Sequence, residues 1–162
     1  MRIFGKRLSE YVAFSRVFLI LIPVVGIARL ALSLGGEPNS TVKWVSVTAL
    51  LWIALIYYSV RVHTTGFGSY KQLLAIIVLL NLVAQAVIIA GIILAIVTGR
   101  PNIYSAPEYA FGGDGATWLH VAAHLFIGTI AGSLVPWLIG SLILFATKKL
   151  SPVSDRKFKS IA

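Results

Sequence analysis

The stretch LLAIIVLLNLVAQAVIIAGIILAIV, residues 73–97, decides the fold class of this chain. None of its residues is charged, and its only polar side chains are the amides of Asn81 and Gln85. A run of about 20 apolar residues is long enough for a helix to cross the hydrocarbon core of a bilayer. The sequence TGRP follows at 98–101, and Gly and Pro end helices. The stretch therefore predicts one complete transmembrane helix.

Three further apolar runs surround this stretch, and each predicts another crossing. The last run is long for a single crossing, so it must tilt, kink at Pro136 or protrude from the bilayer. Together the four runs predict an all-α, polytopic membrane protein: a single domain over 1–162 that forms a four-transmembrane-helix bundle. The expected spans are 11–32, 44–60, 73–97 and 116–147, with tails at 1–10 and 148–162.

The composition supports a membrane protein. Charged residues make up 12% of the chain and hydrophobic residues 58%, with a mean hydropathy of +0.91. Soluble domains carry about 25% charged residues, so a water-soluble fold of this size could not cover its surface. The four spans leave no room for a separate soluble catalytic domain. Cysteine is absent, which excludes disulfides, thiolate metal sites and a cysteine nucleophile.

The distribution of Lys and Arg predicts the orientation. Three of them, Arg29, Lys43 and Arg100, fall on the side of the first and third loops. An excess of basic residues marks the cytoplasmic side, so we expect a multi-pass protein of the cell (inner) membrane with both termini in the cytoplasm. The net charge of +9 then indicates contact with anionic lipid at that face rather than with nucleic acid. Eleven basic residues lie on the expected cytoplasmic side: Arg2, Lys6, Arg7, Arg16, Arg61, Lys71, Lys148, Lys149, Arg156, Lys157 and Lys159.

The first span has a competing interpretation as a cleaved signal peptide. A basic start, a short apolar core and the small-x-small sequence ALS at 31–33 are typical of such a segment. Arg29 fits poorly between that core and the cleavage site, and apolar residues continue to Leu34. We favour a retained span, and the alternative stays open.

His120 and His124 are the sharpest candidate site. Their i, i+4 spacing places both rings on one helix face, and ionisable residues inside a span suggest a function. As structural residues they would hydrogen-bond to a neighbouring helix, with Gln85 at a similar depth as the candidate partner. This interpretation, which we favour, needs no cofactor.

Three other roles for the histidines stay open. As metal ligands they would need a third group, such as Asp114 or Glu108. As haem ligands they are poorly placed, because two residues on one helix face cannot occupy both axial positions of one haem. The last role is that they carry protons along a path through the bundle.

Small residues in the fourth span predict a packing face. The i+4 series continues from His124 through Gly128, Gly132, Pro136 and Gly140. Glycines at this spacing allow two helix backbones to approach closely. We expect Gly91 and Ala95 to form the matching contact face on span 73–97.

Arg29 and the two acidic residues of loop 98–115 predict a charge pairing at the outer face. Arg29 lies near the outer end of the first span, and Glu108 and Asp114 lie in the loop. We expect one of these carboxylates to pair with Arg29 and anchor the loop.

Three functional hypotheses follow. The chain lacks G-x-G-x-x-G, P-loop, G-x-S-x-G and H-E-x-x-H motifs, so enzymatic activity is not favoured. The first hypothesis is a protein that acts by helix–helix interaction, as a subunit or stabiliser of a membrane complex or as a homo-oligomer. The second is a metal- or haem-binding redox protein that uses His120 and His124. The third is a small transporter, which no inverted repeat supports.

Overall fold

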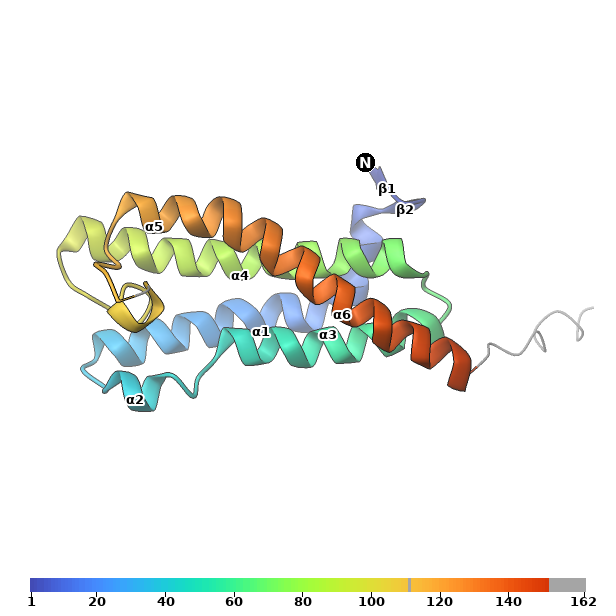
Figure 1. Ribbon diagram of the computed structural model, residues 1–162, viewed down its shortest axis with the longest axis horizontal. Helices are drawn as coiled ribbons and strands as arrows, with labels where there is room; N and C mark the ends of the chain where they lie inside the picture. Colours follow the sequence, from blue (N-terminus) through green and yellow to red (C-terminus); the bar gives the residue numbers. More distant parts are fainter. Residues whose placement is uncertain (111, 152–162) are drawn as a thin grey trace, which may run out of the picture.

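The computed structural model describes residues 1–110 and 112–151. Within them, four helical segments are long and apolar enough to cross a membrane: Leu8–Leu34, Asn39–Thr64, Tyr70–Thr98 and Trp118–Leu150. They lie side by side as an elongated bundle (Figure 1). The predicted helical fold with four candidate membrane spans is confirmed. The end of the predicted tail 148–162, with Arg156, Lys157 and Lys159, lies outside the described residues.

Two of the four segments are not single continuous helices. α1 (Leu8–Leu34) and α4 (Tyr70–Thr98) are unbroken. The second segment consists of a short α2 (Asn39–Val42) and then α3 (Val47–Thr64). The fourth is built from α5 (Trp118–Ala123), a single π-helical turn η2 (His124–Gly128) and α6 (Thr129–Leu150).

Local capping explains where two helices begin. We predicted a span from 44, but α3 starts at Val47 because the Ser46 hydroxyl accepts a hydrogen bond from the Ala49 amide at 3.2 Å. In the same way Thr117 caps α5 by accepting from the His120 amide at 3.2 Å. The fourth helix therefore begins at Trp118, two residues later than predicted.

The predicted N-terminal tail is instead a β-hairpin. β1 (Arg2–Ile3) pairs antiparallel with β2 (Lys6–Arg7). The connecting Phe4 and Gly5 have φ angles of 48° and 87°, as a tight hairpin turn requires. Strands of two residues are too short to show an alternation of apolar and polar residues, so the hairpin could not be predicted.

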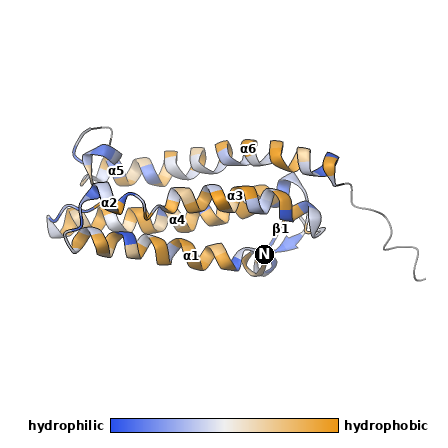
Figure 2. Ribbon diagram, turned by 90° about the horizontal axis from the view of Figure 1, so that it is seen from below, coloured by the Kyte–Doolittle hydropathy of each residue, from blue (hydrophilic) through white to orange (hydrophobic). Residues whose placement is uncertain are grey.

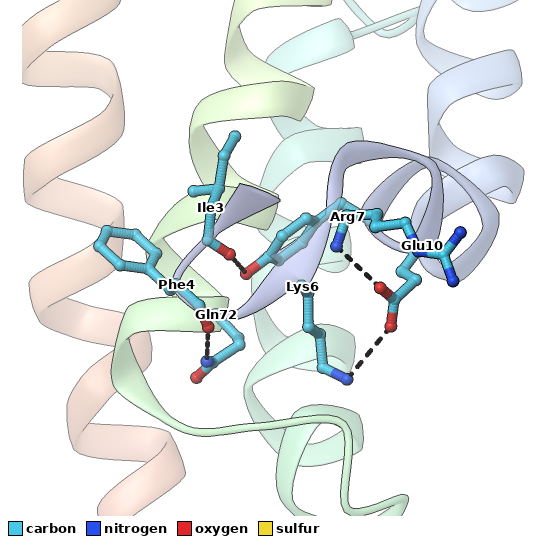
Figure 3. A network of polar contacts seen from close by, with 7 residues as sticks. Ile3, Phe4, Lys6, Arg7, Glu10 and Gln72 are labelled. Atoms are coloured by element: carbon cyan, nitrogen blue, oxygen red, sulfur yellow. Dashed lines mark hydrogen bonds and ion pairs between the residues drawn. The ribbon is translucent and has the colours of Figure 1, made fainter. Parts of the chain in front are cut away.

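Side chains of α1 and α4 hold this hairpin in place (Figure 3). Tyr11 donates its hydroxyl to the Ile3 carbonyl at 3.0 Å, and Gln72 donates its amide to the Phe4 carbonyl at 2.9 Å. Glu10 accepts from the Arg7 amide at 2.7 Å and lies 3.5 Å from the Lys6 ammonium. The hairpin is thus fixed against the first turn of both helices.

Both ends of the described chain lie at one end of the bundle, which we call the basic end (Figure 1). Lys148 donates to the Ser69 hydroxyl at 2.7 Å, so the end of α6 meets the start of α4. The His63 ring lies 2.8 Å from the Ser151 carbonyl. At the opposite end, the loop end, the long connection from α4 to α5 covers the bundle. The 3-10 turn η1 (Pro107–Tyr109) lies in this connection.

Most of the outer surface along the helices is hydrophobic, and hydrophilic residues gather at the two ends (Figure 2). Large apolar side chains such as Ile20, Ile53 and Leu142 are 62%, 58% and 70% exposed. Water would penalise such a surface strongly, whereas lipid tails would not.

The fourth segment crosses the bundle rather than following one neighbour (Figure 1). α5 packs on α4, whereas α6 packs on both α3 and α4. Since its first part lies away from α3, space remains between α3 and the turn η2. The candidate site lies in that space.

Candidate functional site

A chain of three polar side chains connects α4 to the fourth segment. The His124 Nδ1 atom lies 2.8 Å from the Gln85 Oε1 atom. Gln85 Nε2 donates to Asn81 Oδ1 at 3.3 Å. Asn81 Nδ2 in turn faces the carbonyls of Gly128 and Thr129, both at 3.1 Å, and the Ser133 hydroxyl at 3.0 Å. We call His124, Gln85 and Asn81 the polar relay.

The direction of every hydrogen bond in the relay follows from the two backbone carbonyls. A carbonyl can only accept, so the amino group of Asn81 must face them and its oxygen must face Gln85. Gln85 then donates to Asn81 and presents its own oxygen to His124. His124 must therefore carry a proton on Nδ1, which in the neutral ring leaves Nε2 as a free acceptor.

The glycines of the predicted packing face make room for the relay. A Cβ at Gly128 would lie 3.0 Å from the Gln85 amide, and one at Gly132 would lie 3.1 Å from Asn81 Nδ2. The i+4 glycines thus face the two i+4 amides in antiparallel order. Gly140 packs against α3, where a Cβ would lie 2.7 Å from Leu55 Cδ1.

The prediction that Gly91 of α4 packs against these glycines is wrong. Gly91 does not face the fourth helix, because the space for a Cβ there is filled by the ring of Tyr104. The Tyr104 hydroxyl donates to the Gly26 carbonyl at 2.9 Å. Gly91 therefore makes room for Tyr104, a side chain of the α4–α5 connection that inserts between α1 and α4. The spacing of small residues predicts only contacts between helices, so it gave no sign of a loop side chain at Gly91.

The π turn η2 lies directly beside the relay. His124 is its first residue, and Gly128, whose carbonyl receives Asn81, is its last. The Thr129 hydroxyl donates to the His124 carbonyl at 3.3 Å across the turn. Single π turns inside helices occur frequently at functional sites. The i+4 series in the sequence gives no sign of this interruption.

His120 is held separately from the relay. Its Nδ1 atom lies 2.8 Å from the Gly115 carbonyl, so Nδ1 donates and the ring is tied to the residues before α5. The centroids of the His120 and His124 rings are 4.9 Å apart. The pair thus shares one face, as the spacing predicts, with a different partner for each ring.

An apolar cavity of about 370 Å³ opens between α3 and the fourth segment. Its polar lining groups are mainly His124, Gln85, Asn81 and Thr48. The rest of the wall is apolar and comes from α3, α4 and α6, and it includes Leu51, Trp52, Ile77, Val135 and Pro136.

A second cavity of about 380 Å³ lies toward the loop end. Arg29, Lys43, Tyr104 and Tyr109 line it, and it shares Thr48, Ile88 and His124 with the first cavity. His124 therefore borders both cavities.

The predicted pairing of Arg29 with an acid is not found. Within the described residues no ion pair joins Arg29 to Glu108 or Asp114. The Arg29 guanidinium instead lies over the rings of Tyr104 and Tyr109, with its central carbon 5.3 and 5.2 Å from the ring centroids. Charge counting along the sequence ignored aromatic rings as partners for a cation.

Both acidic residues have other contacts. Glu108 accepts from the Asn39 amide at 3.0 Å. A hydrogen bond from its own backbone amide, and the one from Asn39, lower the pKa of the Glu108 carboxyl. Asp114 accepts from the Ala116 amide at 2.9 Å, and so it closes a local turn instead of capping the helix.

The described residues contain no complete set of metal ligands. Among them, no group of three or more His, Cys, Asp or Glu side chains is placed to hold a metal ion. His120 and His124 both use Nδ1 as a donor, which leaves the Nε2 atom of each as a possible ligand atom. The metal and haem hypotheses stay untested predictions.

Comparison with protein-family models, curated proteins and solved structures gave no match. Function must therefore be argued from the site.

Proposed function

We propose that this chain is an integral membrane protein that binds a hydrophobic or amphipathic small molecule between α3 and the fourth segment. The single observation that carries the proposal is the cavity of about 370 Å³, in which an apolar wall meets the polar relay. Binding sites for small molecules have this character: mostly apolar, concave and with a few placed polar groups. The unengaged Nε2 atom of His124 would orient the ligand.

The charges of the two ends support the orientation that we propose with this function. The residues Arg2, Lys6, Arg7, Arg16, Arg61, Lys71, Lys148 and Lys149 belong to the basic end. Of the basic residues that the structure describes, three belong to the loop end: Arg29, Lys43 and Arg100. An excess of basic residues marks the cytoplasmic side of a cell membrane. The basic end therefore faces the cytoplasm, as both termini do, and it contacts anionic lipid there.

Binding is better supported than assembly with a partner protein. The hypothesis of a complex subunit or homo-oligomer rested on the glycines of the fourth span. Gly128, Gly132 and Gly140 all pack against side chains of this same chain, so they no longer point to a second protein. Self-association stays a prediction, and these glycines no longer supply a contact surface for it. The transporter hypothesis would need the cavity to open toward both sides of the membrane.

The test uses stearamide, a neutral single-chain amphiphile, added to the full-length protein in a mild sugar detergent. Native mass spectrometry measures the bound fraction. Ala131 lines the cavity, so Ala131→Trp should fill it and lower stearamide binding at least 10-fold. Ala146→Trp, at an exposed position on the same helix, is the matched control and should bind as the wild type does. Binding that is equal in both variants would contradict the proposal.

A further inference from the structure

Arg29 is a buried cation that has no carboxylate partner among residues 1–110 and 112–151. Its side chain is 8% exposed. Its Nε atom has no hydrogen-bond partner. The two tyrosine rings beside the guanidinium offer their faces but no negative charge. An arginine has five N–H donors, and burying a charge is costly unless it is paired. The Nε–H group of Arg29 therefore lacks an acceptor, and an anion in the neighbouring cavity would supply both that acceptor and a counter-charge.

The cavity beside Arg29 has the charge that an anion requires. Lys43 is the second cation in its wall, and Ser46 and Thr48 add hydroxyl groups. The acidic residues of this end, Glu37, Glu108 and Asp114, do not line it. A planar guanidinium and an ammonium are the groups with which proteins bind phosphate and carboxylate.

This cationic cavity adjoins the apolar cavity of the proposed function. Thr48, Ile88 and His124 line both. The two cavities are thus neighbours with a shared part of their walls: the one near the loop end is lined by two cations, and the other has an apolar wall within the helices. A molecule that fills both must have an anionic head and an apolar chain.

We propose that the ligand is an anionic single-chain amphiphile whose phosphate or carboxylate head binds Arg29 and Lys43. Its chain lies in the apolar cavity between α3 and the fourth segment, past His124. This inference rests on the proposed function, and it adds the class of the ligand and the residues that select the head.

The test compares probes that differ only in the head. Stearate and stearoyl lysophosphatidate carry the two possible anions, stearamide is neutral, and inorganic phosphate has no chain. Binding to the wild-type protein in a neutral sugar detergent is titrated by native mass spectrometry. We expect at least one anionic amphiphile to bind 10-fold or more tightly than stearamide, and the stronger one identifies the head. Inorganic phosphate should bind at least 10-fold more weakly than lysophosphatidate.

Variants then assign the preference to residues. Arg29→Gln should abolish the preference for the anionic head while stearamide binding stays within 2-fold of the wild type. Lys43→Gln should weaken the preference at least 3-fold, and it tests the inference separately if Arg29→Gln does not fold. Arg100→Gln removes an exposed cation from the same end that lines neither cavity, and it should change nothing.

The outcomes separate this inference from the function on which it rests. Equal binding of anionic and neutral probes, or an equal loss in Arg29→Gln and Arg100→Gln, would overturn the inference and leave the proposed function standing. Phosphate that binds as tightly as lysophosphatidate would also overturn it, because the chain would then contribute nothing. Absence of binding for every amphiphile would overturn the proposed function itself.

Discussion

At the scale of single residues, the polar relay depends on the proton that His124 donates to Gln85. His124→Gln supplies a donor of similar reach, so it should keep the relay and the thermal stability of the wild type. His124→Ala removes the donor and leaves Gln85 Oε1 unpaired, which should cost about 1–3 kcal/mol. Thermal unfolding in detergent measures both. Equal stability of the two variants would show that the 2.8 Å contact contributes nothing.

The Asn39–Glu108 contact is the residue-level prediction for pH. Its hydrogen bonds hold the pKa of Glu108 below the ordinary 4.5. A lowered pKa means that the stabilising contact is complete above 4.5 and is lost as pH falls through the folded value. Hydrogen exchange in the loop around Glu108 should therefore accelerate at acidic pH. In Asn39→Ala the loop should exchange faster already at neutral pH, and a wild-type profile there would rule out the contact as an anchor.

The sequence predicts a contact where depth in the membrane or spacing along a helix determines the partner. It does not predict the contact where a folded loop supplies the partner. The His124–Gln85 contact follows from equal depth in antiparallel helices. The rings over Arg29 come from the folded loop, and no local pattern announces Tyr104 or Tyr109 as its neighbours. Phe111, the third aromatic residue of loop 98–115, lies outside the described residues.

At the scale of elements, the close approach of α4 and the fourth segment depends on glycine. Gly132→Leu would push a side chain against the Asn81 amide, because even a Cβ atom at this position would lie only 3.1 Å from Asn81 Nδ2. Overpacking of this kind costs about 1–3 kcal/mol, so the melting temperature should fall. Ala146→Leu adds the same side chain at an exposed position of α6 and should leave the melting temperature unchanged. A stable Gly132→Leu protein would mean that the two helices are not in contact here.

Hydropathy located the helices because the length and apolar character of a span are local properties. It could not locate η2, since the series from His124 to Gly140 reads as an uninterrupted helical face. The hairpin at Arg2–Arg7 was also beyond it, because its stability comes from Tyr11 and Gln72 on other elements.

At the scale of the whole molecule, the arrangement predicts a topology. Reporter tags at the N-terminus, at the C-terminus and at residue 66 should report the cytoplasm, and tags at 38 and 106 should report the opposite side. The physical reason is the excess of basic residues at the end of the bundle where Met1 and Ser151 lie. A tag at 106 that is active only in the cytoplasm would contradict the orientation, although the bundle itself would stand.

Photolabelling tests the central claim, a ligand site between α3 and the fourth segment, most directly. A diazirine-bearing stearamide is activated on the full-length protein, and the labelled positions are mapped by peptide sequencing. The account predicts labels near Leu51, Trp52 and Val135 on the cavity wall. Excess stearamide should remove them, and Ala131→Trp should lack them. Labels that spread equally to exposed positions outside the cavity lining, such as Ile20 and Leu82, and that excess stearamide does not reduce would contradict it.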